Sequence, residues 1–225
     1  MSEGSETHPP AGDWAAKAEQ QVLDHALVLA PQEGWTSRLA MKAGRAAGFS
    51  PGETELLIPH GARDLAALLS RRHDALALAA LKDVDPAKLK IRERIAAAVT
   101  ARLDASARDE GAVRRWAGFL ALPANVALAG KLAWESADVL WRWAGDTATD
   151  ENHYSKRGLL AGILTGALAI RLASGRADAL AFVDRRIADV MAFEKWKATT
   201  TLRPGATLAQ LAAGLGRLRY GRPPS

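Results

Sequence analysis

The stretch from Trp134 to Gly166 holds the residues whose types and spacing could support binding chemistry. Three of the seven tryptophans fall within ten residues there, and acidic, hydroxyl, histidine and basic side chains follow them. At 100° per residue, Trp134 and Trp141 share one face of a helix and Trp143 lies on the opposite face. A helix that is apolar on both sides is either buried on both sides or keeps one side for a ligand or partner.

Glycines recur at four-residue spacing just after the indoles, at Gly158, Gly162 and Gly166. On one helix they form a ridge without side chains, which another helix can approach closely. The tryptophans then have two interpretations. As core they fill volume, which is the usual role of indoles, the one expected for Trp116 and the one that residue types alone favour. As pocket lining, indoles beside the glycine ridge would leave a slot for a long, slim apolar ligand.

The segment from Trp141 to Arg157 resembles the signature of a family of ubiquinone-biosynthesis accessory proteins. It reads Trp-Arg-Trp-Ala-Gly-Asp-Thr-Ala-Thr-Asp-Glu-Asn-His-Tyr-Ser-Lys-Arg. The likeness extends from about Trp14 to Ala198. It implies a Tet-repressor-like helical fold, binding of isoprenoid lipids, and assistance to the hydroxylase that acts late in coenzyme Q synthesis.

The resemblance also implies a lipid site and a partner-facing patch on these helices. The lipid would contact Trp134, Trp141, Leu159, Gly162, Ile163 and Gly166. The patch would comprise Asp138, Leu140, Trp143, Thr147, Asp150, His153, Tyr154 and Arg157. The family usually has tryptophan where this chain has His153, so the contact there is expected to differ. The alternative for Asp146, Asp150 and Arg157 is local capping and a helix-end ion pair, worth about 1 kcal/mol or less when exposed.

Composition favours an all-α protein. Alanine, leucine and arginine dominate the 225 residues, and the chain is long enough to bury a substantial core. The absence of cysteine excludes disulfides and thiolate chemistry. The net charge is +5, and the segment from Lys195 to Ser225 holds six basic residues and no acidic one. The body is therefore close to neutral, which weakens a general nucleic-acid interpretation.

The N-terminal part has the layout of a helix-turn-helix domain. Helical patterns cover residues 14–29, 36–47 and 53–58, with a glycine-containing turn at 48–52. The segment that would contact DNA carries Glu53 and Glu55, whose carboxylates repel phosphate. A retained scaffold without DNA binding is therefore favoured, and nucleic acid is not an expected partner. The alternative function is a Tet-type transcriptional repressor with an apolar ligand pocket, which Lys42, Arg45 and Arg63 leave open.

Four further helical patterns complete the body. They cover residues 64–81, 86–103, 113–122 and 175–197, and Ile91, Ile95, Val99 and Leu103 form the core stripe of the second. The fold class is thus all-α: a Tet-repressor-like helical bundle with a vestigial N-terminal helix-turn-helix and a C-terminal amphipathic helix. We assign residues 13–198 to the lipid-binding domain and residues 199–225 to a hinge and a membrane-contacting tail.

The tail favours a helix that lies in a membrane interface. Beyond a hinge at Pro204 and Gly205, its apolar and basic residues are Leu208, Leu211, Leu215, Arg217, Leu218 and Arg219. Docking of this helix onto the body is the alternative. The apolar run from Gly158 to Ile170 is shorter than the ~20 residues needed to cross a bilayer. Residues 1–12 lack Lys and Arg, so we expect a cytoplasmic protein, peripheral on the inner face of a bacterial-type inner membrane.

Catalytic patterns are weak. Asp150 and His153 could supply half of a metal site, but the sequence has no second arm and no phosphate-binding glycine loop. We therefore expect no enzyme, no catalytic residue, no metal and no cofactor other than a bound isoprenoid lipid or phospholipid. The predicted protein is a homodimer that takes a quinone precursor from membrane lipid and presents it to a di-iron demethoxyubiquinone hydroxylase.

Overall fold

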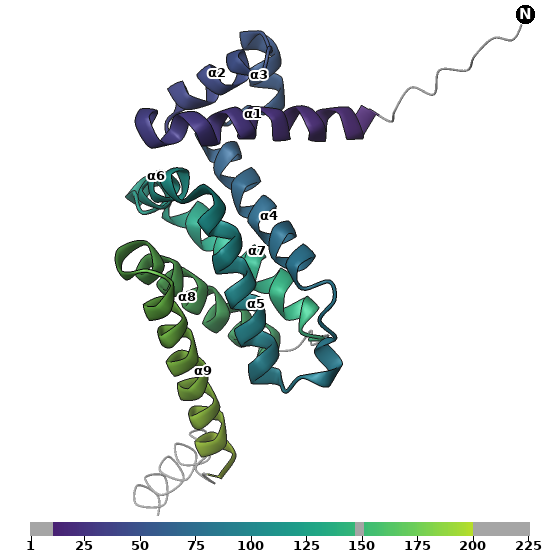
Figure 1. Cartoon of the computed structure of the whole chain (residues 1–225), viewed down its shortest axis with the longest axis vertical. Coiled ribbons are helices and arrows are strands. Elements are labelled where there is room, and N and C mark those ends of the chain that lie inside the picture. The colour runs from purple at the N-terminus through teal and green to yellow at the C-terminus, as the bar shows by residue number, and fades with distance from the viewer. Residues whose placement is uncertain (1–10, 147–150, 200–225) are drawn as a thin grey trace, which may run out of the picture. The chain divides into compact units, whose positions relative to one another are not determined.

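The computed structural model describes residues 11–146 and 151–199, and their regular structure is entirely helical. In chain order the helices are α1 (Ala11–Glu33), α2 (Ser37–Ala46), α3 (Pro51–Leu57), α4 (Ala62–Ala80), α5 (Ile91–Ser106), α6 (Glu110–Leu120), α7 (Val126–Trp143), α8 (Glu151–Ser174) and α9 (Arg176–Thr199) (Figure 1). The prediction of an all-α protein is confirmed.

The chain divides into two compact units, residues 1–183 and 184–225. The first unit contains α1 to α8 and the beginning of α9. Arg176 at that beginning donates two hydrogen bonds of 2.8 Å to Asp104 of α5, and Arg171 of α8 reaches the same carboxylate. In the second unit, Arg186 pairs with Asp189 one turn later. The predicted division at residue 198 stays a prediction.

Local signals place the short helices near the N-terminus. The Thr36 hydroxyl accepts a hydrogen bond from the Leu39 backbone N–H and caps α2. Ser50 and Glu53 form a reciprocal capping box at the start of α3. Gly48, at φ +89°, makes the turn between the two helices.

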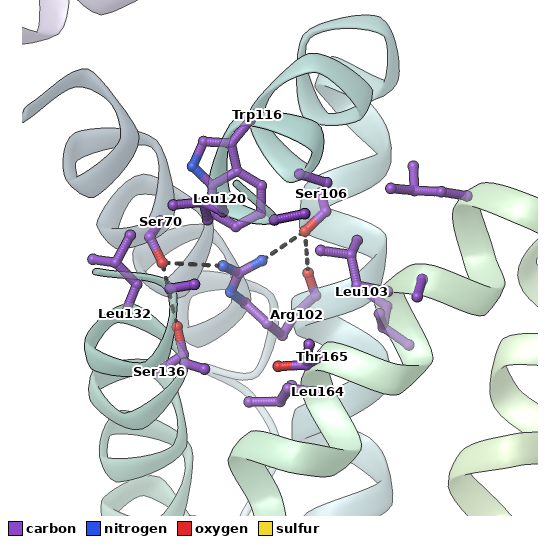
Figure 2. A pocket seen from close by; sticks show the side chains of 17 residues that line it. Ser70, Arg102, Leu103, Ser106, Trp116, Leu120, Leu132, Ser136, Leu164 and Thr165 are labelled. Carbon is purple, nitrogen blue, oxygen red and sulfur yellow. Dashed lines mark hydrogen bonds between the residues drawn. The ribbon is translucent and has the colours of Figure 1, made fainter. Parts of the chain in front are cut away.

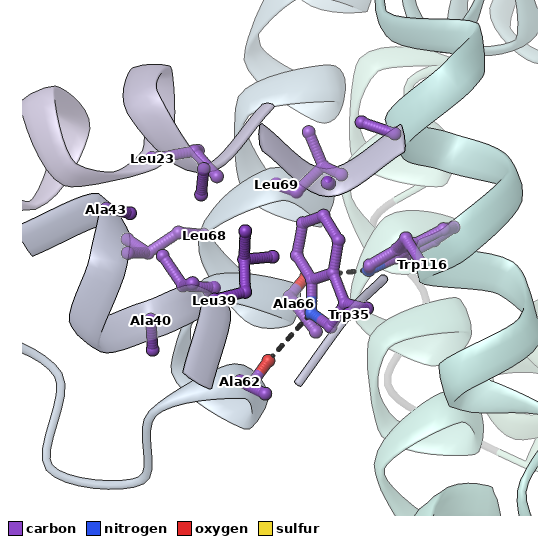
Figure 3. Close-up of a cluster of buried hydrophobic side chains, with 14 of the residues drawn as sticks. Leu23, Trp35, Leu39, Ala40, Ala43, Ala62, Ala66, Leu68, Leu69 and Trp116 are labelled. Carbon is purple, nitrogen blue, oxygen red and sulfur yellow. Dashed lines mark hydrogen bonds between the residues drawn. The ribbon is translucent and has the colours of Figure 1, made fainter. Parts of the chain in front are cut away.

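Helices α4 to α8 surround a cavity (Figure 2), and α1, α2 and α6 pack with α4 in the main apolar cluster (Figure 3). Two buried indoles fix this cluster. Trp35 donates its ring N–H to the Ala62 carbonyl at 2.9 Å, and Trp116 donates to the Ala66 carbonyl at 3.1 Å. The predicted burial of Trp116 is confirmed, although its ring also faces the cavity.

Two sequence expectations need correction. Ile91 was expected in the core stripe of α5 but is 40% exposed, because it is the first residue of the helix. The other three members of that stripe are buried as predicted. The apolar run of α8 is longer than expected: by length and composition, Tyr154–Ser174 could cross a membrane. Core helices of water-soluble proteins meet the same criteria, so this is weak evidence for a membrane span.

The glycine ridge of α8 has two different environments. A Cβ atom added to Gly158 or Gly162 would meet open space. A Cβ added to Gly166 would lie 2.8 Å from the ring of Phe182 in α9. Of these three glycines, only Gly166 is approached closely by another helix among the described residues.

We predict opposite effects of alanine at these two glycines. Gly166→Ala should lower the free energy of unfolding by about 1–3 kcal/mol, because the methyl group overlaps the Phe182 ring. Gly162→Ala should raise it by up to about 1 kcal/mol, because alanine is the better helix former and nothing opposes its side chain. Urea unfolding of both variants measures the difference. Destabilisation by Gly162→Ala would mean that another helix covers this face.

Candidate functional site

A cavity of about 290 Å³ lies within the first unit. Five helices contribute to it, and its walls are mostly alanine and leucine. The lining residues are Ser70, Arg102, Leu103, Ser106, Trp116, Ala117, Leu120, Ala121, Ala129, Leu132, Ala133, Ser136, Leu164, Thr165, Leu168, Ala169 and Leu172. Small side chains facing one another on neighbouring helices leave this space unfilled.

The buried end of the cavity is polar. Arg102, 6% exposed, donates from Nε to Asp74 at 2.6 Å and from Nη1 to Ser106 at 2.6 Å, and a longer contact of 3.5 Å joins Nη2 to Ser70. Ser136 of α7 donates to the second carboxylate oxygen of Asp74 at 2.9 Å. Figure 2 shows the guanidinium group between Ser70 and Ser106, below the indole of Trp116. Helices α4, α5 and α7 therefore meet at one buried ion pair.

This polar end can bind a ligand oxygen. Each terminal nitrogen of Arg102 carries two N–H groups, and Ser106 and Ser70 accept one each. Asp74 balances the positive charge, so the site does not require an anion. In a water-poor cavity, a hydrogen bond to a charged donor is stronger than one in water. A ligand with carbonyl or ether oxygens at one end and hydrocarbon elsewhere fits this division.

The lining residues are buried at one end of the cavity and exposed at the other, and the exposed end is its opening. Arg102, Leu103 and Trp116 are buried, whereas Ala121, Thr165 and Ala169 are exposed. The opening therefore lies between the end of α6 and the middle of α8. The buried polar residues Ser70, Arg102, Ser106 and Ser136 are at the closed end, and Ala121, Thr165 and Ala169 are at the open end.

Nearby, His73 of α4 is fully buried but does not line the cavity. Its Nε2 lies 3.2 Å from Asp109, and its Nδ1 has no hydrogen-bond partner within the described part of the chain. Burial lowers the pKa of His73 despite the neighbouring carboxylate. The ring is therefore neutral at physiological pH and adds no charge to the region.

The six residues predicted to bind lipid do not line this cavity. Trp134 and Trp141 are half-buried; the Trp141 ring N–H donates to the Lys156 carbonyl at 3.0 Å, and the Trp134 ring lies 6.0 Å from that of Tyr154. Leu159 and Gly162 are exposed, Ile163 is buried, and Gly166 is half-buried against Phe182. The cavity uses the same two helices, but through other faces of them. A lipid-binding role for these six residues stays a prediction.

The structure separates the predicted partner patch into surface and interior. Tyr154 is 65% exposed, and Asp138 and Trp143 are half-buried. Leu140 is fully buried and Arg157 is 1% exposed, so neither presents its side chain to a partner in this conformation. Thr147 and Asp150, the side chain of His153, and the predicted membrane-binding residues of the tail lie outside the described residues.

Arg157 has a structural environment instead. Its guanidinium donates to Asp138 of α7 and, at 3.1 Å, to Asp146, which also accepts from Lys156 at 2.8 Å. Burial raises the pKa of both carboxyl groups, but the hydrogen bonds from these cations outweigh it, and each pKa lies below its usual value. The exposed helix-end pair that the sequence suggested is therefore a buried ion network that joins α7 to α8.

The chain is similar to known ubiquinone biosynthesis proteins. The family model named COQ9 matches residues 126–194, which include α7 and α8. The mitochondrial ubiquinone biosynthesis protein COQ9-A of Xenopus laevis is 26% identical over 190 residues, covering 77% of this chain and 57% of the relative. The probable ubiquinone biosynthesis protein coq9 of Dictyostelium discoideum is 26% identical over 200 residues, covering 84% of this chain and 64% of the relative. The resemblance to the ubiquinone-biosynthesis family is confirmed.

Two further facts follow from these comparisons. The chain spans about three fifths of the length of the curated relatives that it matches. The predicted location, cytoplasmic and on the inner face of a bacterial-type membrane, is contradicted, because these relatives are named mitochondrial proteins. A pattern in residues 1–12 could not decide the location, because the chain covers only part of its relatives.

We predict that Arg157 stabilises the fold. Arg157→Met should lower the free energy of unfolding by about 1–3 kcal/mol, because the two carboxylates lose their shared buried cation and keep only the more exposed Arg142 and Lys156. Arg142→Met is the matched control. Arg142 also pairs with Asp138, but its side chain is 71% exposed, so its loss should cost less than about 1 kcal/mol. If urea unfolding shows the same loss of stability in both variants, Arg157 does not have this stabilising role.

Proposed function

We propose that this protein is a non-enzymatic accessory protein of ubiquinone biosynthesis that binds a polyisoprenoid quinone precursor. It holds this lipid at a membrane and presents it to a di-iron hydroxylase. The observation that carries the proposal is the apolar cavity with a polar closed end. Helices α7 and α8, which form part of the cavity wall, lie in the segment matched by the COQ9 family model.

The chemistry of the cavity suits one end of such a lipid. A quinone ring carries carbonyl and ether oxygens that accept hydrogen bonds, and the terminal nitrogens of Arg102 offer the donors that Ser106 and Ser70 do not take up. The isoprenoid chain is hydrocarbon, as are most of the walls. Ligand pockets commonly enclose ~300–1,000 Å³, and a cavity of about 290 Å³ is too small for a whole polyisoprenoid. The rest of the chain would leave through the opening.

The Tet-repressor-like fold is part of the proposal, and the order and lengths of α1 to α4 support it. The helix that would enter the major groove, α3, exposes Glu53, Glu55 and Leu56. These side chains offer neither cations nor hydrogen-bond donors to DNA, so the helix-turn-helix is a scaffold. A homodimer is also part of the proposal.

Presentation to the hydroxylase would use the exposed aromatic corner of α7 and α8. Tyr154 is exposed, Trp134 lies against its ring, and Trp143 is half-buried at the end of α7. Aromatic side chains on a rigid, partly exposed surface are common energetic centres of protein interfaces. The Arg157 network beneath them holds the two helices together.

We predict that blocking the opening removes the ligand. Ala169→Trp places an indole in the exposed part of the cavity wall and should greatly reduce the lipid that co-purifies with the protein, as measured by mass spectrometry of an organic extract. Ala173→Trp is the control, because Ala173 is exposed on the same helix but does not line the cavity. If both variants carry as much lipid as the unmodified protein, the cavity is not the lipid site.

We predict that Tyr154→Lys weakens binding to the hydroxylase by about 30-fold, which corresponds to ~2 kcal/mol for an interface aromatic. Circular dichroism should show an unchanged helical content, because Tyr154 is 65% exposed. Trp14→Lys is the control, since Trp14 is an aromatic residue of α1 that is 56% exposed. Isothermal titration calorimetry of each variant with the hydroxylase measures the affinity. An equal loss of affinity in both variants would indicate a general effect of the added charge.

A further inference from the structure

The corner between α6 and α7 carries exposed apolar side chains. Leu122 is 53% exposed and Val126 is 58% exposed, and Ala121, Pro123 and Ala124 around them are exposed as well. Exposed apolar side chains that lie together can mark a contact with another apolar phase.

The backbone of this corner is held in place from inside. Asn125 is 6% exposed and donates from its side-chain amide to the Phe119 carbonyl at 2.9 Å. The Asn125 backbone N–H donates to the Leu122 carbonyl at 2.8 Å. Leu122 and Val126 therefore project from a defined turn and need no rearrangement to contact a partner.

The corner borders the opening of the cavity. Ala121, directly before Leu122, is one of the exposed lining residues. Ala129 also lines the cavity and lies three residues after Val126, on the same face of α7. Whatever covers Leu122 and Val126 therefore adjoins the entrance.

The charges around the corner suit a lipid surface. From Trp116 to Gly130 the sequence contains no charged residue, and the nearest basic residues are Arg114, Arg115 and Lys131. Arg114 pairs with Glu110, and Lys131 pairs with Glu135. Arg115 is exposed and donates to a backbone carbonyl, that of Pro31. Apolar side chains that enter a membrane interface are commonly accompanied by basic residues, which interact with the headgroups.

We propose that the α6–α7 corner inserts Leu122 and Val126 into a lipid bilayer, so that the cavity opens directly into the membrane. The inference rests on the proposed lipid-binding function and adds a membrane contact on the folded body, separate from the tail. A bilayer fits better than a protein, because a convex corner with two large apolar side chains is far smaller than the ~800 Å² per partner of a stable protein interface. A lipid passing between bilayer and cavity then never crosses water.

Single-cysteine labelling tests the insertion, because the chain has no cysteine of its own. Leu122→Cys and Val126→Cys, each in the full chain, are labelled with a fluorophore that responds to polarity and mixed with phosphatidylcholine–phosphatidylglycerol vesicles. We expect a blue shift, and quenching by a lipid-attached nitroxide. Leu56→Cys is the control, since Leu56 is 84% exposed on α3, outside the corner, and its label should remain in water. Labels at 122 and 126 that stay in water while the protein sediments with vesicles overturn the proposal.

A double variant separates this inference from the proposed function. Leu122→Ser with Val126→Ser should weaken vesicle binding by ~10-fold or more through loss of apolar burial and slow the uptake of lipid from vesicles. The control variant, Val28→Ser with Leu56→Ser at other exposed apolar positions, should change neither vesicle binding nor the rate of lipid uptake. Reduced self-association of the first variant without vesicles would assign the corner to a protein contact and overturn the insertion. If the unmodified protein takes up no lipid although its corner labels enter the bilayer, the proposed function fails and the insertion stands.

Discussion

The buried ion pair between Arg102 and Asp74 is the interaction on which the cavity depends. It joins α5 to α4, and Ser136 extends the same network to α7. Removing one member of such a pair commonly costs about 3–5 kcal/mol, because the other charge stays buried alone. The separation of these three helices is thereby fixed, and the small residues between them cannot close the gap. The cavity persists because its polar end resists collapse, whereas a purely apolar wall of alanine and leucine could repack.

Much of the helical framework follows from local sequence, because caps, turns and apolar periodicity act over a few residues. Thr36 caps α2 where a helix was expected to begin, and Ile95, Val99 and Leu103 are buried as their spacing predicts. The cavity could not be predicted in this way. Arg102 and Asp74 are 28 residues apart and meet only through packing of α4 on α5, and in the sequence each is an ordinary helix-surface charge. The serines that complete the network carry no distinguishing spacing either.

Tertiary contacts that the sequence does not reveal also decide which side chains of the α7–α8 segment are exposed. The residue types there carried the family resemblance, which is confirmed. They could not distinguish outward from inward side chains, because Arg157 is buried only by carboxylates from α7 and from the turn after it. The glycine ridge likewise has one close helix contact at Gly166 and open space at Gly158 and Gly162. Spacing predicts that a helix can be approached closely, but the partner comes from tertiary structure.

The arrangement of polarity along the cavity constrains how a ligand enters. An oxygen-bearing ring loses its water on entering, and that loss is costly unless new hydrogen bonds replace it. The replacement donors are the N–H groups of Arg102, which lie at the far end and are already oriented by Ser70 and Ser106. The exposed end, near Ala121 and Ala169, is dominated by small apolar side chains. This arrangement, with apolar residues at the opening and donors at the closed end, suits a molecule that enters from lipid. Such a molecule has little bound water to lose at the opening, and it forms hydrogen bonds with the donors only when it is fully inside.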